Sequence, residues 1–149
     1  MANEARILSS LTLRKVSNGR VVLEYQNRPA TFIADVDGAK GPTPGAFAVS
    51  IYGTDCDLSE LTQPGLAVFK NLDDTNWVEY GIRDPETLKF YPLGALLPGE
   101  EYVIRLSPNL YEEYPEVGTG TGTSGAGTNT LRFRANYAGV NVSVEAFEA

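Results

Sequence analysis

Hydrophobic and polar residues alternate along most of the chain, with the period of two that is typical of β-strands. Residues 11–14 alternate two leucines with a threonine and an arginine, and residues 21–26 resume the same pattern. Asn18-Gly19 lies between them, and this dipeptide favours the left-handed conformations of a tight hairpin turn. The pattern therefore predicts a first β-hairpin over residues 11–26.

Further strands follow from the same alternation. We expect them at Thr31–Val36, Phe47–Tyr52, Leu66–Lys70, Trp77–Ile82, Phe90–Leu93, Tyr102–Leu106, Leu131–Ala135 and Val140–Glu145. Residues 41–45 read Gly-Pro-Thr-Pro-Gly and predict a loop, because proline has no N–H for a β-ladder. The polar segment 71–76 predicts a turn that makes a second hairpin of the strands beside it.

Many short strands separated by turns indicate an all-β protein, either a single antiparallel β-sandwich (jelly-roll-like) or a small barrel with long loops. The chain has 149 residues and is 42% hydrophobic, which suffices for one domain over residues 1–149 with one core. Two segments are expected to be flexible: an N-terminal arm over residues 1–6, and the glycine- and threonine-rich loop 118–127.

Charge and hydropathy narrow the classes of partner. The net charge is −7, with 12 basic and 19 acidic residues and no basic cluster. Neutralising phosphate groups needs clustered lysine and arginine, so we expect no nucleic-acid or anionic-membrane partner. No segment approaches the roughly 20 apolar residues of a membrane span. The N-terminus lacks a secretion-signal pattern, so we expect synthesis and folding in a reducing cytoplasm.

The residues for common catalytic and metal sites are missing from the sequence. There is no histidine, and Cys56 is the one cysteine, which excludes a Ser-His-Asp triad and disfavours a zinc site. Acidic pairs at 35/37, 55/57 and 73/74 have the right ligand type for calcium but not the spacing of a calcium loop, so turn formation is the simpler interpretation. We expect no catalytic residue, no cofactor and no bound metal.

Two features are candidates for partner contact. The glycines of the 118–127 loop match G-x-G-x-x-G, but no strand precedes them and no helix follows, so an exposed loop is the better interpretation. Aromatic residues could also stack on a sugar or a partner protein. We expect Trp77 to lie in the core or at its rim, and Tyr111 and Tyr114 to be exposed. The candidate contact residues are Arg6, Tyr111, Tyr114, Gly120 and Gly122.

Several turns and strands occur together in a recognisable order. A strand over 65–70 leads into an Asn-Leu-Asp-x-Thr-Asn turn at 71–76 and a strand Trp-Val-Glu-Tyr-Gly at 77–81. A Pro-Gly-Glu turn at 98–100 comes next, and residues 142–148 close the pattern. In this order the chain resembles a group of small virion structural proteins of tailed bacteriophages. The resemblance covers about residues 58–147 and does not include the glycine loop.

The resemblance implies a β-sandwich that decorates or cements the outer surface of a capsid, made in the host cytoplasm and located on the virion. Its expected partners are the major capsid protein and copies of itself. The acidic charge fits an outward position, since a surface facing the packaged genome favours basic residues. The alternative is a tail or baseplate component that contacts glycans through exposed tyrosines. A carbohydrate-active β-sandwich enzyme ranks below both.

Overall fold

The computed structural model describes residues 5–34, 40–85, 87–107, 110 and 130–148. Every regular element in these ranges is a β-strand, and all paired strands are antiparallel, which confirms the predicted all-β class. No helix long and apolar enough to cross a membrane occurs among the described residues. Contacts divide the chain into two compact units, 1–36 and 37–149, so the single domain over 1–149 stays a prediction.

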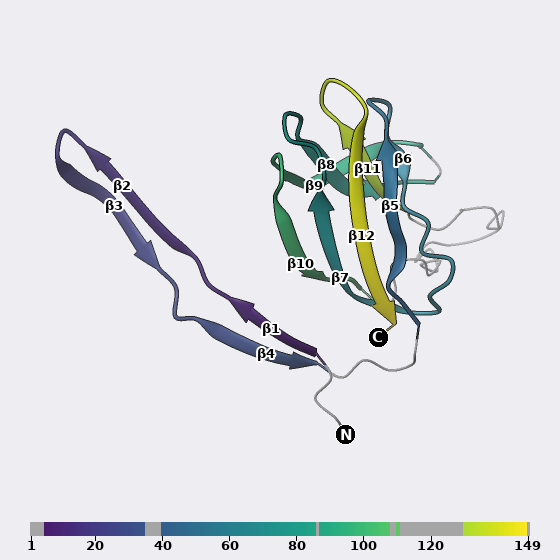
Figure 1. The fold of residues 1–149 in the computed structure, drawn as a ribbon, viewed down its shortest axis with the longest axis horizontal. Coiled ribbons are helices and arrows are strands. Elements are labelled where there is room, and N and C mark those ends of the chain that lie inside the picture. Colours follow the sequence, from purple (N-terminus) through teal and green to yellow (C-terminus); the bar gives the residue numbers. More distant parts are fainter. Residues whose placement is uncertain (1–4, 35–39, 86, 108–109, 111–129, 149) are drawn as a thin grey trace, which may run out of the picture. The chain divides into compact units, whose positions relative to one another are not determined.

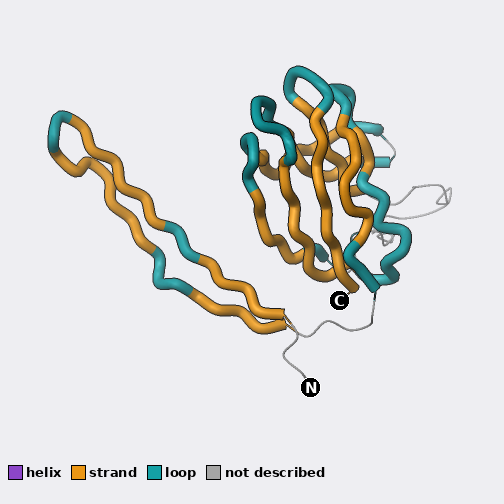
Figure 2. The backbone as a smooth tube through the Cα atoms, viewed as in Figure 1, coloured by secondary structure: helices purple, strands orange, loops and turns teal. Residues whose placement is uncertain are grey.

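The first unit is a long two-stranded ribbon, named here the ribbon (residues 5–34). Its strands are β1 (Ala5–Ser9), β2 (Thr12–Ser17), β3 (Arg20–Gln26) and β4 (Ala30–Ala34). β2 pairs with β3 and β1 with β4, so the ribbon is one hairpin with a short break halfway along its length (Figures 1 and 2). At the tip, Asn18 and Gly19 both have positive φ, 49° and 74°. This is the turn that the Asn-Gly dipeptide predicts.

The second unit, named here the body, contains eight strands. They are β5 (Thr43–Val49), β6 (Thr54–Asp55), β7 (Pro64–Asn71), β8 (Val78–Arg83), β9 (Phe90–Leu96), β10 (Glu101–Arg105), β11 (Thr130–Ala135) and β12 (Val140–Glu148). They form two four-stranded sheets in the orders β10-β7-β12-β5 and β6-β11-β8-β9. The two sheets face each other (Figures 1 and 2). Eight strands arranged in two such sheets form a jelly roll, as predicted.

The second predicted hairpin is wrong. β7 and β8 lie in opposite sheets, and the rings of Phe69 and Tyr80 meet edge to face across the layers with centroids 5.4 Å apart. The chain crosses between sheets again from β9 to β10 and from β11 to β12. Alternation identifies a strand, but the turn geometry decides whether the next strand pairs beside it or packs opposite it.

The proline-rich loop is also shorter than predicted. β5 begins at Thr43, so Pro44 and Gly45 already belong to a strand. β5 is the last strand of its sheet and pairs only with β12. An edge strand has a neighbour on one side only. It therefore tolerates proline at positions where the N–H would point away from that neighbour.

The core lies between the two sheets and is closed by aromatic rings. Phe133 on β11 packs edge to face against Phe69 and Phe47, with ring centroids 5.2 and 5.8 Å apart. β12 contributes Val140, Val142 and Val144 through its inward positions. All buried apolar side chains of the described chain lie between Val49 and Ala146. None of the ribbon side chains that the structure describes belongs to this core.

Candidate functional site

The turns at 71–76 and 98–100 are held together by hydrogen bonds within the body. The main-chain N–H of Gly99 donates to the Asp73 oxygen at 3.1 Å, and that of Asn71 donates to the Glu100 oxygen at 2.9 Å. The Glu100 carboxylate accepts from the N–H of Leu97 at 2.8 Å. These residues position the ends of β7, β9 and β10, so their role here is to build the fold.

The ribbon presents apolar side chains to solvent along its length. Those described as exposed are Leu8, Leu11, Leu13, Val16, Val21, Val22, Leu23 and Tyr25, each at 45% or more. The pairing places Leu13 opposite Tyr25 on the ribbon. A two-stranded hairpin by itself is only marginally stable in water. A ribbon that exposes this much apolar surface is a candidate interaction surface.

Charge is divided unevenly between the two units. The first unit, residues 1–36, holds five basic and three acidic residues, of which residues 5–34 contain all five basic and one acidic, whereas residues 37–149 hold seven basic and sixteen acidic residues. The acidic residue of the ribbon, Glu24, lies opposite Arg14 across β2 and β3. The negative charge of the whole chain thus belongs to the body, and the ribbon is basic.

Among the strands that the structure describes, one of the four sheet edges of the body lacks the features that protect an edge. β6 has two residues, and β5 contains Pro44. β9 contains Pro92 and a bulge, because Gly94 and Pro92 pair with successive residues of β8 and leave Leu93 without a partner in the ladder. β10 pairs with β7 on one side and has neither a proline nor a bulge. Unprotected edges such as this one favour pairing with another strand.

Aromatic side chains also gather at one end of the body. Tyr52 and Tyr137 are 84% and 86% exposed, in the connections that follow β5 and β11. A main-chain hydrogen bond joins these two connections: the Ala135 N–H donates to the Ser50 oxygen at 3.1 Å. The next residue, Asn136, donates to the Trp77 oxygen at 3.3 Å. Trp77 is 37% exposed and is not one of the residues packed against the core, which differs from the predicted position in the core or at its rim. We name Tyr52, Trp77 and Tyr137 the end-loop aromatics.

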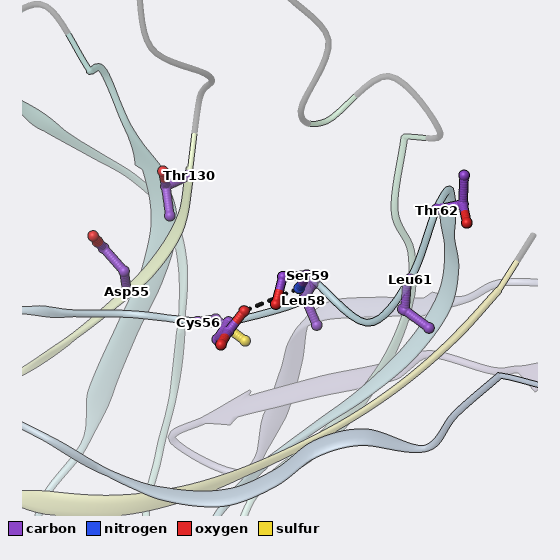
Figure 3. A pocket seen from close by; sticks show the side chains of 8 residues that line it. Asp55, Cys56, Leu58, Ser59, Leu61, Thr62 and Thr130 are labelled. Carbon is purple, nitrogen blue, oxygen red and sulfur yellow. Dashed lines mark hydrogen bonds between the residues drawn. The ribbon is translucent and has the colours of Figure 1, made fainter.

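A hollow of about 480 Å³ opens beside Cys56, and Figure 3 shows the side chains that line it. Its polar groups include Asp55, Asp57 and Ser59. Burial, with a smaller contribution from the Asp57 charge, raises the pKa of the Cys56 thiol to about 12. The thiol therefore stays protonated at neutral pH, and a protonated thiol is a poor nucleophile.

The acidic pairs serve turns and ion pairs wherever the structure describes them. Asp55 accepts from Arg132 at 2.7 Å and from Arg83 at 3.0 Å. Asp57 accepts from the Ser59 N–H at 3.0 Å. Asp73 accepts from the N–H groups of two following residues. No group of three or more potential metal ligands occurs in the described ranges.

Of the candidate contact residues, Arg6 is exposed and lies on β1 opposite Ile33. Residues 1–4 of the expected flexible arm lie outside the described residues, and residue 5 already belongs to β1. Tyr111, Tyr114, Gly120, Gly122 and the whole loop 118–127 also lie outside the described residues. Sequence reasoning missed the ribbon surface and the exposed tyrosines at 52 and 137. The alternation in the ribbon was visible, but it does not reveal that neither face is buried.

Comparison of the chain with protein-family models, with curated proteins and with solved structures found no match.

Proposed function

We propose that this protein is a structural component of a tailed-phage virion, and specifically a decoration protein that binds the outer surface of the capsid. One observation carries the proposal: a body that closes its own core is joined to a ribbon whose apolar side chains are exposed. The core of the body is filled by side chains of the body's own strands and connections. Burial of its apolar side chains against a neighbouring protein would stabilise the ribbon, so the chain is suited to work inside an assembly.

The jelly-roll architecture supports a structural function in a virion by analogy. This architecture occurs in viral capsid proteins and in lectins, although a fold by itself does not fix a function. The order of turns and strands over 65–106 adds a resemblance to phage virion proteins. The acidic body suits an outward position on the particle, away from packaged nucleic acid.

Stabilisation of the shell would follow from mass action. A protein that binds the intact shell but not its broken form shifts the equilibrium toward the intact shell. Many equivalent sites on one particle let modest individual contacts add up. A specific contact usually buries about 800 Å² on each partner. At about 3.3 Å per residue the ribbon is about 40 Å long, so its surface is large enough for such a contact.

The test is to purify particles with and without the protein, image both and heat both. We expect density at regular sites on the shell, and rupture at a lower temperature when the protein is missing. Density confined to the tail would transfer the proposal to the alternative below. Absence from purified particles, together with turnover of a polysaccharide, would contradict both structural functions.

The end-loop aromatics favour one alternative, a tail or baseplate component that contacts host glycans. Exposed aromatic rings stack on the apolar faces of sugars, and lectins share the jelly-roll architecture. A glycan array, followed by titration of any hit, tests this. The paired substitution Tyr52→Ser and Tyr137→Ser should abolish glycan binding, and Tyr91→Ser on β9 is the matched control. Absence of any glycan signal would set the alternative aside.

A further inference from the structure

We infer that the ribbon of one copy adds as an extra strand pair to the β10 edge of a second copy, so that copies are joined ribbon to edge. The inference goes beyond the proposed function and does not depend on it. Purified protein without any capsid suffices to test it. Failure of the test would leave the capsid-binding proposal standing. Failure of capsid binding would equally leave this inference standing.

The first support is the open hydrogen-bond ladder of β10. The N–H of Leu106 donates to the Gly65 oxygen at 2.7 Å, and the Glu100 oxygen accepts from Asn71 at 2.9 Å. Residues of an antiparallel strand face their partner alternately. The register therefore directs the main-chain N–H and C=O groups of Glu101, Val103 and Arg105 away from β7. No strand of the described ranges pairs with these groups, so a further strand could add to them.

The second support is the side-chain chemistry beside this ladder. Leu97, Tyr102 and Val103 are exposed apolar side chains on β10 or in the turn that leads into it. The ribbon offers exposed apolar side chains of the same kind, including the cross-strand pair Leu13 and Tyr25. Pairing of the two would remove apolar surface from water on both copies.

The third support is charge, which points to a second copy as the partner. The body as a whole holds sixteen acidic and seven basic residues, although at β10 itself Glu101 is paired with Lys70 and Arg105 adds a positive charge. The ribbon has five basic residues and one acidic residue. Opposite net charges attract the ribbon of one copy to the body of another and speed their encounter.

Light scattering on the full chain, from about 1 µM to about 1 mM, tests the inference over the usual range of transient contacts. We expect the mass to rise above that of the monomer with concentration, and to fall when salt screens the charges. Val103→Pro removes an N–H that points away from β7, so it should weaken association about tenfold or more while the body stays folded. Val103→Thr keeps the N–H and is the matched control. A monomer at all concentrations overturns the inference.

A second measurement avoids any doubt about the fold of a β10 variant. Leu13→Asp with Tyr25→Asp changes the ribbon alone, which contributes no side chain to the core. This variant should stay monomeric. In the unmodified chain, amide exchange at Val103 and Arg105 should slow as the concentration rises, whereas in the ribbon variant it should not. Association with unchanged exchange at these amides would show that a different surface joins the copies, and would also overturn the inference.

Discussion

The side-chain amide of Asn71 donates a hydrogen bond of 2.8 Å to the main-chain oxygen of Asn76, across the turn that takes the chain from β7 to β8. The same amide lies 3.2 Å from the oxygens of Leu96 and Leu97. Its own oxygen accepts from the Asp73 N–H at 2.9 Å. One fully buried side chain thus joins the end of β7 to the end of β9, in opposite sheets.

Replacing Asn71 by leucine should lower the free energy of unfolding by about 2–4 kcal/mol, because it leaves buried main-chain oxygens without their donor. Urea unfolding measures the loss. Asn141→Ala, at an exposed position of β12, is the control and should change the unfolding free energy by less than about 0.5 kcal/mol. Equal effects of the two substitutions would contradict the role assigned to Asn71.

Stability should fall in acid partly through Asp73. Hydrogen bonds from the N–H groups of Asn76 and Thr75 hold the pKa of Asp73 below its ordinary value of 3.8. Because the folded-state pKa is the lower one, the contribution is present above the unfolded pKa and is lost as pH falls through the folded pKa. Asp73→Asn should therefore be less stable than the unmodified chain at about pH 6, with the gap closing toward about pH 2. A gap that stays constant would contradict this.

The Cys56 thiol should be nearly inert in the folded protein. Its pKa is raised from 9.0 to about 12, which leaves about a thousandfold less thiolate at pH 8. Reaction with a chromogenic disulfide reagent should be slow in buffer and fast in denaturant. Equal rates in the two solutions would show that the thiol is accessible and ionised.

Removing residues 1–36 should leave the thermal unfolding midpoint of the body unchanged at low protein concentration. The buried apolar side chains of the described chain all lie in the body, so no core contact is lost. Circular dichroism in the β region, on the full and shortened chains, measures the two midpoints. A drop of several degrees in the shortened chain would mean that the ribbon packs on its own body.

Much of the fold was predictable because alternation and turn chemistry are local. The Asn18-Gly19 hairpin and the strands β11 and β12 follow directly from such patterns. The pairing of strands was not predictable in the same way. Asn71 and the residues of its turn look like hairpin residues, whereas the strand pairing places β7 and β8 in opposite sheets, joined through the buried amide of Asn71.

The candidate site was less predictable than the fold. Much of the ribbon alternates, although Val21, Val22 and Leu23 are consecutive, so its sequence suggests one buried face, whereas both faces are exposed. The contact residues expected at 111–122 lie outside the described residues. Tyr52 and Tyr137 had no special sequence context, because their exposure follows from the position of two connections at one end of the body.

The protection of three of the four sheet edges limits the valence of each copy. With Pro44 on β5, two residues in β6 and Pro92 on β9, β10 is the one edge among the described strands that remains to accept a ribbon, and each chain has one ribbon to give. Units with one donor and one acceptor form closed pairs, rings or linear strings, but not branched networks. Around a particle, such units would form girdles of defined direction, in which the loss of one copy breaks a single link.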